Sequence, residues 1–490
     1  MKSILISLLC LVTIVVAAQE KSSKSSPQIP TGTVASQGTA QIGGKSVAYK
    51  ATTGYLQVQD KEGVHKANMF YVSYIKQGET NLKIRPITFV FNGGPGAASV
   101  WLHMGALGPK RIAMTVDGNA QKPPYSIVNN EYSWLDITDL VFIDPVGTGF
   151  SKPAEGEKAD QFYGFENDVK WVSDFIRQWT SDNNRWGSPK YLAGESYGTT
   201  RACGVVEYLM EEYSMYFNGI SLISCALDFQ TLREFENNDM PFICNLPVYT
   251  YAALYHNKLK PAQSQDKDLI AKVEAFALNE YALALLQGDK LTSAQKQSIA
   301  NSLELYTGIS AEIYLQHNLR LPSHKFRKYL LDSDDKIIGR YDVRLLMDDP
   351  INNRDYAGDD PSYTQISGAF GTAFNEYVRT DLQYKNNLPF YVIGNVQPWK
   401  FSDGKYLNVT SELRQAMYTN PYMKVWMANG LYDLATSYFG TQYFVNHMNL
   451  SPELQKNISM TYYKGGHMMY FVESELKQLK EDAVKLYQAK

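Results

Sequence analysis

The sequence predicts an α/β fold in which a mostly parallel central sheet is flanked by helices. Short apolar runs, such as residues 87–91 and 139–143, alternate with segments whose apolar residues recur at helical spacing, such as 165–180. This alternation is typical of parallel sheets, because the connecting helices cover both faces. Three Gly-containing turns directly follow such strands. Ligands of these sheets bind at the carboxyl ends of the strands, so the turns predict the functional site.

The first part of the predicted α/β domain spans residues 38–228. It begins with β-type segments separated by Gly or charged turns, which we expect to form antiparallel hairpins at one edge of the sheet. Periodic apolar residues then predict helices over 165–180 and 199–212. The predicted strands are 39–42, 46–52, 54–59, 67–75, 86–91, 139–143, the run that ends at Gly194, and 220–227.

The alternation of strands and helices breaks at Asp228. From residue 229 to 398 no buried parallel strand is evident, and the patterns over 266–287 and 292–305 are helical. We expect this stretch to form a largely helical cap insertion that narrows the mouth of the site. The second part of the α/β domain, residues 399–490, is predicted to contain strands 424–428 and 458–463 and helices 438–446 and 473–489.

The N-terminal residues have the pattern of an export signal. Met1-Lys2 is followed by an almost wholly apolar run over 4–16 and then by Ala17-Ala18-Gln19, which predicts cleavage near Ala18. We therefore expect a signal peptide over 1–18, a flexible leader over 19–37, and a periplasmic or secreted protein. A lipoprotein anchor at Cys10 is the less favoured alternative, and no later stretch predicts a membrane span.

Composition excludes several classes of function. The chain has 490 residues, of which 44% are hydrophobic, and a formal net charge of −3, so it is globular and has no surplus of positive charge for nucleic acid. The three cysteines beyond the signal, Cys203, Cys225 and Cys244, match no metal motif. We expect Cys203 to be buried, and a Cys225–Cys244 disulfide is compatible with export. The charged turn over 332–335 is interpreted as solvated, so no metal or cofactor is predicted, and oligomeric state stays open.

The most informative turn is Gly194-Glu195-Ser196-Tyr197-Gly198. It joins an apolar run to a helical segment, which is the context of the nucleophile elbow of an α/β hydrolase. The turn is so tight that its flanking positions need glycine. It presents the Ser196 hydroxyl beside backbone N–H groups at a helix N-terminus, which can hold a developing oxyanion. The expected fold is therefore the α/β-hydrolase fold with a largely helical cap insertion.

A nucleophilic serine needs a base, and the base needs a carboxylate that fixes its tautomer. His467 follows a predicted strand in a Gly-rich loop that can direct it inward. Asp433 follows the preceding strand, which gives the Ser–Asp–His order of this fold, and we favour it over Asp228. The other histidines after Ser196 are less suitable: His256, His317 and His324 fall in the cap, and His447 has the pattern of a surface residue.

Five motifs occur in order between residues 85 and 470. They are Asn92-Gly93-Gly94-Pro95-Gly96, Asp144-Pro145-Val146-Gly147-Thr148-Gly149-Phe150-Ser151, Gly194-Glu195-Ser196-Tyr197-Gly198, Asn429-Gly430-Leu431-Tyr432-Asp433 and Gly465-Gly466-His467-Met468. In this order they resemble the serine carboxypeptidases of peptidase family S10, with a bacterial-type character. The resemblance implies Ser196 as nucleophile, His467 as general base and acid, and Asp433 as the residue that orients His467. It also implies that the backbone N–H groups of Gly94 and Tyr197 form the oxyanion hole.

The resemblance further implies that Asn92, Gly93 and Glu195 bind the terminal carboxylate of the substrate. A protonated Glu195 can donate to that carboxylate, whereas an ionised one would repel it. The better-known eukaryotic members of the family carry a second Glu where this chain has Ala106. His103 lies one helical turn earlier, where we expect it to have a packing role.

We therefore expect an exported serine carboxypeptidase that hydrolyses C-terminal peptide bonds through a Ser acyl-enzyme and favours acidic pH. Its partners would be peptides or polypeptides with a free C-terminus. The alternatives are an esterase or acyltransferase of the same fold, and a catalytically decayed peptide-binding protein.

Overall fold

The computed structural model describes residues 32–349 and 360–489, so the predicted signal peptide and the first part of the leader lie outside the described residues. The main sheet has the strand order β1-β2-β3-β7-β4-β9-β10-β13-β14, with β8 paired to β3. Neighbours from β7 to β14 run parallel, and the remaining pairs run antiparallel. These strands are β1 (Thr33–Ile42), β2 (Lys45–Gln59), β3 (His65–Lys76), β4 (Ile87–Phe91), β7 (Asp139–Ile143), β8 (Lys152–Pro153), β9 (Lys190–Ser196), β10 (Gly219–Cys225), β13 (Lys424–Gly430) and β14 (Ile458–Tyr463).

The predicted α/β fold with an antiparallel edge is confirmed, with two differences at that edge. Strand β1 begins at Thr33, inside the range predicted as leader, because it pairs with β2 as far as Gly54. Strand β2 is continuous where two strands were predicted. Gly54 lies within it at φ +150°, a conformation that L side chains rarely adopt. The glycine therefore accommodates an irregularity in one long strand rather than a turn between two.

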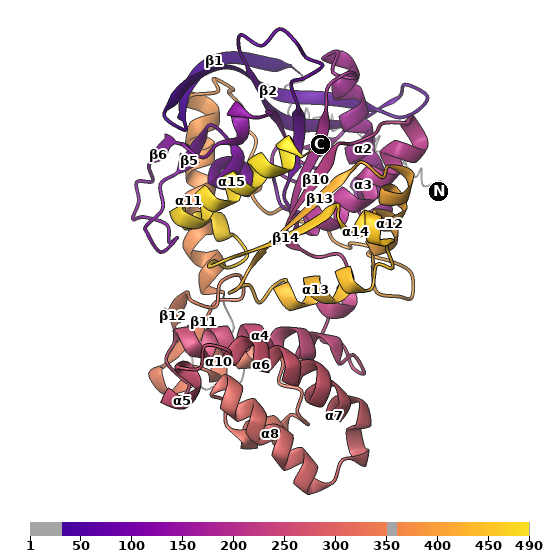
Figure 1. Cartoon of the computed structure of the whole chain (residues 1–490). Helices are drawn as coiled ribbons and strands as arrows, with labels where there is room; N and C mark the ends of the chain where they lie inside the picture. The colour runs from indigo at the N-terminus through magenta and orange to yellow at the C-terminus, as the bar shows by residue number, and fades with distance from the viewer. Residues whose placement is uncertain (1–31, 350–359, 490) are drawn as a thin grey trace, which may run out of the picture. The chain divides into compact units, whose positions relative to one another are not determined.

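Helices cover both faces of the sheet. Successive residues of a strand point to opposite faces, so the buried strands present apolar side chains on both sides. Phe89 of β4 has a ring contact with Trp179 of α2, whereas its neighbour Thr88 bonds to the hydroxyl of Tyr487 in α15 at 2.5 Å. Helices α2, α3 and α12 pack together on the first face, and α11 and α15 lie on the second (Figure 1). Their bounds are α2 (Phe165–Asp182), α3 (Tyr197–Tyr213), α11 (Pro361–Thr380), α12 (Thr410–Thr419) and α15 (Glu473–Gln488).

The residues after Asp228 form a helical layer with a hydrophobic core of its own. Leu246, Val273 and Leu303 belong to this core, and Tyr438 of the α/β part joins it. The predicted helix over 266–287 is divided by a π-turn, η5, into α6 and α7. The elements here are η4 (Phe229–Thr231), α4 (Met240–Tyr255), α5 (Pro261–Ser264), α6 (Leu269–Phe276), η5 (Ala277–Tyr281), α7 (Ala282–Gln287), η6 (Gly288–Lys290), α8 (Ser293–Thr307), α9 (Ala311–Gln316), α10 (Ser323–Tyr329), η7 (Asp332–Asp334), β11 (Lys336–Ile338) and β12 (Leu346–Asp348).

The last part of the predicted insertion packs on the main sheet instead of on these helices. The Tyr377 hydroxyl in α11 lies 3.0 Å from that of Tyr74 in β3, and Trp101 has a ring contact with Phe370. Further along, Val396 belongs to the hydrophobic core that includes strands of the main sheet. The helical layer therefore ends well before residue 398.

The remaining short elements connect these layers. They are α1 (Val100–Leu102), η1 (His103–Leu107), β5 (Lys110–Ile112), β6 (Ile127–Asn129), η2 (Trp134–Asp136), η3 (Ala159–Phe162), α13 (Tyr438–Asn446), α14 (Pro452–Gln455) and η8 (Met469–Phe471). None of the helices among the described residues is both long and apolar enough to cross a membrane.

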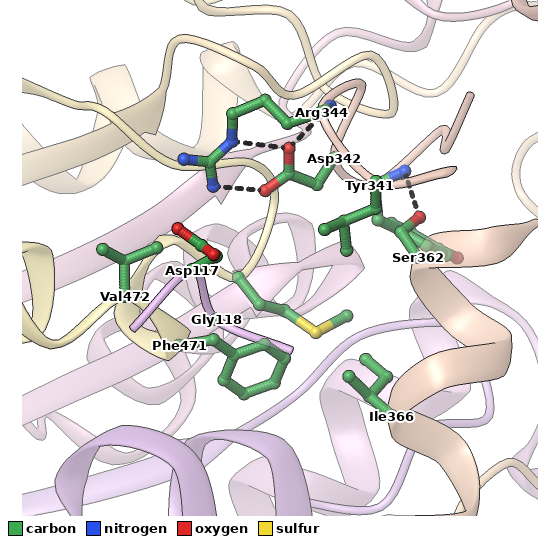
Figure 2. A pocket seen from close by; sticks show the side chains of 11 residues that line it. Asp117, Gly118, Tyr341, Asp342, Arg344, Ser362, Ile366, Phe471 and Val472 are labelled. Atoms are coloured by element: carbon green, nitrogen blue, oxygen red, sulfur yellow. Dashed lines mark hydrogen bonds and ion pairs between the residues drawn. The ribbon is translucent and has the colours of Figure 1, made fainter. Parts of the chain in front are cut away.

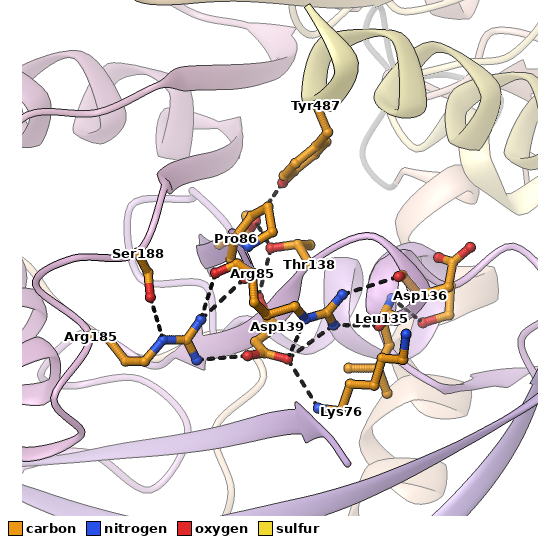
Figure 3. A network of polar contacts seen from close by, with 12 residues as sticks. Lys76, Arg85, Pro86, Leu135, Asp136, Thr138, Asp139, Arg185, Ser188 and Tyr487 are labelled. Atoms are coloured by element: carbon orange, nitrogen blue, oxygen red, sulfur yellow. Dashed lines mark hydrogen bonds and ion pairs between the residues drawn. The ribbon is translucent and has the colours of Figure 1, made fainter. Parts of the chain in front are cut away.

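A buried ionic network ties three central strands together at their amino ends (Figure 3). The Asp139 carboxylate at the start of β7 accepts from Arg85 Nε at 3.0 Å and from Arg185 Nη1 at 2.7 Å. Arg85 precedes β4 and Arg185 precedes β9, and all three side chains are buried. Since ligand sites of such sheets lie at the carboxyl ends of the strands, we interpret this network as structural.

The three cysteines among the described residues are unpaired and buried. Cys203, Cys225 and Cys244 are all free thiols, so the possible Cys225–Cys244 disulfide is contradicted and the predicted burial of Cys203 is confirmed. Cys225 ends β10 and Cys244 lies in α4, each within a packed interior. Burial raises the pKa of the Cys203 thiol well above its ordinary value, which keeps it uncharged.

The charged turn near residue 332 forms ion pairs with two lysines. Lys328 Nζ pairs with Asp332, and Lys258 Nζ lies 2.7 Å from the Asp334 carboxylate. No cluster of three or more potential metal-ligating side chains occurs within 32–349 and 360–489.

Candidate active site

Ser196 lies on a strained turn between β9 and α3. Its φ of 59° and ψ of −129° are unusual for a residue with a side chain. A Cβ on Gly194 would lie 2.3 Å from the Gly198 carbonyl oxygen, and one on Gly198 would lie 2.9 Å from that of Phe91. Only glycine therefore fits at both flanking positions, as the elbow motif predicts.

The loop after β4 lies directly against this turn. A Cβ on Gly93 would lie 2.4 Å from the Tyr197 backbone nitrogen, so the two backbones approach as closely as glycine allows. Gly94 has φ +101°, in the region that favours glycine. Gly94 and Ser196 line the same pocket. The arrangement brings the loop of Gly94 and the start of α3 at Tyr197 to one side of the serine.

His467 and Asp433 are joined by a buried hydrogen bond. His467 Nδ1 donates to Asp433 Oδ2 at 2.7 Å, and the Thr436 hydroxyl donates to the same oxygen at 2.6 Å. Asp433 Oδ1 accepts from the backbone N–H groups of Ala435 and Thr436. The carboxylate is thus fixed on all sides, and the bond to Nδ1 leaves Nε2 as the second ring nitrogen for proton transfer.

The charge environment of His467 favours its protonated form. Burial alone lowers the pKa of His467, but the charge of Asp433, the hydrogen bond to it and the charge of Glu195 together raise it above its ordinary value. Ser196 and His467 line one pocket. In the described part of the chain the Ser196 hydroxyl has no hydrogen-bond partner.

Glu195 is buried beside the serine and is held by two donors. Asn92 Nδ2 donates to Glu195 Oε2, and the Tyr470 hydroxyl donates to the same oxygen at 2.8 Å. The other oxygen, Oε1, is buried without a hydrogen-bond partner among the described residues. Burial raises the pKa of Glu195 to about 7, although the charge of His467 and the hydrogen bonds from Tyr470 and Asn92 oppose the rise. Near neutral pH this carboxyl is therefore present in both its protonated and its ionised form.

Tyr470 is a site residue that the sequence did not reveal. It lies in η8, three residues after His467, and is buried. A Cβ on Gly105 would lie 2.8 Å from Tyr470 Cε2. The tyrosine therefore packs directly against Gly105. Its only sequence signal is its nearness to the His467 loop.

Arg201 is a second residue that the sequence did not single out. Arg201 Nη1 donates to the Asn92 carbonyl oxygen at 2.5 Å, and Arg201 Nε pairs with Asp168 at 2.7 Å. Both charged side chains are buried. The pair thus anchors the loop after β4 to α2 and α3. A charged residue among the inward-facing apolar positions of a predicted helix is the one signal that could have identified it.

The rival candidates lie elsewhere. Asp228 caps η4 by accepting from the Gln230 N–H, and His447 is exposed with Nδ1 2.7 Å from the Tyr443 carbonyl oxygen. His103 stacks on Phe142 with ring centroids 4.1 Å apart, which confirms its packing role. Burial lowers the pKa of His103 to about 3, so it stays neutral. His256 ends α4, His317 ends α9 and His324 lies in α10.

The pocket around Ser196 is partly aromatic and adjoins a second pocket. Its aromatic wall includes Trp101, Tyr341 and Tyr363, and the Tyr341 ring centroid lies 5.1 Å from that of His467. Tyr341 and Met468 also line the second pocket, which Figure 2 shows with Ile366 and Phe471 facing the ion pair of Arg344 and Asp342. Tyr341 follows β11, so the residues beyond Asp228 contribute directly to the wall of the site.

Comparisons with known proteins agree with this geometry. The model of the serine carboxypeptidase family, Peptidase_S10, matches residues 42–485. The lysosomal protective protein of Mus musculus is 21% identical over 428 residues, which cover 84% of this chain and 80% of that protein. Serine carboxypeptidase-like 10 of Arabidopsis thaliana is 29% identical over 170 residues, and that match spans only about a third of either chain, at 34% and 35%.

A solved structure shares the fold. The prohormone-processing carboxypeptidase KEX1(delta)p of Saccharomyces cerevisiae superposes with a TM-score of 0.57 at 16% identity, covering 90% of this chain and 91% of that one. This likeness supports the α/β-hydrolase fold. The family model, which matches most of the sequence, leads to one conclusion: the chain belongs to the serine carboxypeptidase family, the S10 family of serine-type peptidases.

Proposed function

We propose that this protein is an exported serine carboxypeptidase of bacterial type that releases single residues from the C-terminus of peptides. Ser196 attacks the terminal peptide carbonyl, and His467 takes the serine proton and passes it to the leaving amine. Asp433 keeps His467 in the tautomer that this transfer requires. The 2.7 Å bond between Asp433 and His467 supports these roles, as does the shared pocket of His467 and Ser196.

The oxyanion of the tetrahedral intermediate is held by the backbone N–H groups of Gly94 and Tyr197. The close approach of Gly93 to the Tyr197 nitrogen supports this role, since it places the two loops side by side. Such donors act because they are fixed in advance of the reaction, and removing one typically costs about 10²–10³-fold in kcat.

Recognition of the substrate's free carboxylate is assigned to Asn92, Gly93 and Glu195. The observation that carries the proposal is the state of Glu195: it adjoins Ser196, is buried, and has one oxygen without a partner among the described residues. A protonated carboxyl there can donate to a carboxylate ligand, and the ligand's charge raises the pKa of Glu195 further. An esterase has no need of such a group.

We propose that activity favours acidic pH. Glu195 must be protonated to bind a carboxylate, whereas His467 must be neutral to act as base. The two groups lie close enough to affect each other's pKa. The limbs of a bell-shaped profile therefore belong to the pair rather than to either residue. Export to the periplasm or medium is supported by the pattern of residues 1–18 alone.

A substrate pair tests the proposal. Purified protein is given an N-blocked dipeptide with a free C-terminus and the same dipeptide as its C-terminal amide, with release of the terminal residue as readout. We expect cleavage of the acid and little cleavage of the amide. Equal cleavage of both would favour an esterase or acyltransferase. No cleavage, together with no labelling of Ser196 by a fluorophosphonate, would favour a decayed peptide-binding protein.

A further inference from the structure

The two oxygens of the Glu195 carboxyl have different surroundings. Oε2 accepts from the Asn92 amide and from the Tyr470 hydroxyl, whereas Oε1 has no hydrogen-bond partner in the part of the chain that the structure describes. A buried polar atom without a partner is costly. Its presence next to Ser196 points to a ligand that completes the bonding.

The direction of these bonds is set by the surroundings of Asn92. Asn92 Oδ1 accepts from the Leu102 N–H at 3.0 Å, so the amide nitrogen is the atom that faces Glu195. An oxygen that already accepts two hydrogen bonds is a poor place for the acid proton. In the protonated form of Glu195 the proton is therefore carried on Oε1.

We infer that Tyr470 is a positioning residue for substrate recognition: with Asn92 it occupies Oε2, so that Glu195 donates its proton from Oε1 to the terminal carboxylate of the substrate. This inference rests on the proposed function. No bond is made or broken; the proton stays on Glu195 and is shared in a hydrogen bond.

The fold makes room for this tyrosine. Tyr470 Cε2 would lie 2.8 Å from a Cβ on Gly105, and the neighbouring Ala106 is fully buried. A side chain at Gly105 would therefore compete with the ring. Burial raises the pKa of Tyr470 well above its ordinary value, so its hydroxyl keeps its proton and donates to Oε2 of the ionised Glu195 carboxylate.

The hydroxyl also influences the ionisation of Glu195. The pKa of Glu195 is influenced by His467, Asp433, Tyr470 and Asn92. The charge of Glu195 in turn raises the pKa of Tyr341. The Tyr470 bond stabilises the ionised carboxylate and so lowers the pKa of Glu195. Without this bond Glu195 keeps its proton to higher pH, but its carboxyl is less well oriented.

Tyr470→Phe separates these effects because it removes only the hydroxyl and keeps the ring against Gly105. We measure kcat and KM between pH 4 and pH 9 for a free-acid peptide and for its C-terminal ester. A hydrogen bond between uncharged groups is worth up to roughly tenfold in binding. We expect KM for the acid to rise roughly tenfold at pH 5 with kcat little changed, and the alkaline limb to move up by about one pH unit. KM for the ester should change by less than about twofold.

Tyr463→Phe is the matched control. The Tyr463 hydroxyl also donates to a buried carboxylate, that of Asp482 at 2.8 Å, but on β14 and α15 away from the pocket. Tyr463→Phe should leave kcat and KM for both substrates, and both limbs of the pH profile, unchanged. If Tyr470→Phe behaves like this control while the wild type still distinguishes acid from ester, the inference is wrong. If the wild type does not distinguish them, the proposed function itself fails. Thermal unfolding of both variants excludes a general loss of structure.

Discussion

His467 Nδ1 lies 2.7 Å from Asp433 Oδ2, and the carboxylate that receives this bond is wholly buried. The bond joins two loops that follow adjacent parallel strands, β13 and β14. Because the loops leave the same edge of the sheet as the turn at Ser196, the three side chains belong to one site. The alternative acid, Asp228, instead caps a short helix.

This arrangement predicts that Ser196 and His467 act as one unit. Ser196→Ala and His467→Ala should each lower kcat by about 10⁴-fold or more, and the double variant should be little worse than either. His447→Ala is the control, because His447 is exposed and its Nδ1 is close to a backbone carbonyl. Steady-state kinetics on a C-terminal peptide would decide. An inactive, folded His447→Ala beside an active His467→Ala would overturn the assignment.

The buried network at the other end of the strands predicts a loss of stability without loss of catalysis. Asp139→Ala leaves the guanidinium groups of Arg85 and Arg185 buried without their carboxylate. We expect the free energy of unfolding to fall by about 3–5 kcal/mol. Urea unfolding measures this change, and kcat/KM at 25 °C should stay near the wild-type value. Asp403→Asn, which removes the exposed pair with Lys400, should have no measurable effect. Similar stability of the two variants would contradict the role of the network.

Glu195 predicts a stability that depends on pH. Its pKa is about 7 in the folded protein against an ordinary value of 4.5, so the folded state binds more protons than the unfolded state between these values. Stability must therefore fall as pH rises from about 4.5 to about 7. Glu195→Gln lacks this loss. The difference in free energy of unfolding between the variant and wild type should therefore shift by roughly 2–4 kcal/mol in favour of the variant from pH 4 to pH 8. Urea unfolding at both pH values checks it; an equal difference at the two pH values would contradict the raised pKa.

Tyr341, the part of the aromatic wall that packs on His467, predicts an exopeptidase. The backbone carbonyl of Tyr341 accepts from the backbone N–H of His467, and the Tyr341 ring contacts the imidazole. A substrate chain that continued past the cleaved bond would meet this wall. We expect a denatured protein substrate to lose residues stepwise from its C-terminus. Mass spectrometry of the products over time would detect this ladder. Internal fragments from homogeneous enzyme would contradict the expectation.

Short-range signals allowed much of the fold and the geometry at Ser196 to be predicted. The helix Tyr438–Asn446 and the strands Asp139–Ile143 and Ile458–Tyr463 have the predicted bounds. Helix α4 was missed because it is apolar on all sides and contains Pro247, which removes the periodic signal. Helix α11 was missed because Gly368 and Gly371 weaken its helical pattern.

The parts of the site that could not be predicted depend on contacts between distant segments. Tyr470 and Glu195 are 275 residues apart, and Arg201 and Asn92 are 109 residues apart. No sequence motif spans separations of this length. The positions of these polar atoms are determined by tertiary packing, of η8 against η1 and of α3 against the loop after β4.

The most direct test of the account is kcat/KM against pH for a free-acid peptide and its C-terminal ester, in wild type and Glu195→Gln. Glutamine fits the same donors, because its oxygen can accept from Asn92 and Tyr470 while its NH₂ donates to the substrate at every pH. For wild type we predict that activity on the acid falls at high pH while activity on the ester persists. For Glu195→Gln the alkaline limb on the acid should flatten, and loss of the Glu195 charge should lower the pKa of His467 and move the acid limb down. Four superimposable alkaline limbs would contradict the role of Glu195 in recognising the terminal carboxylate.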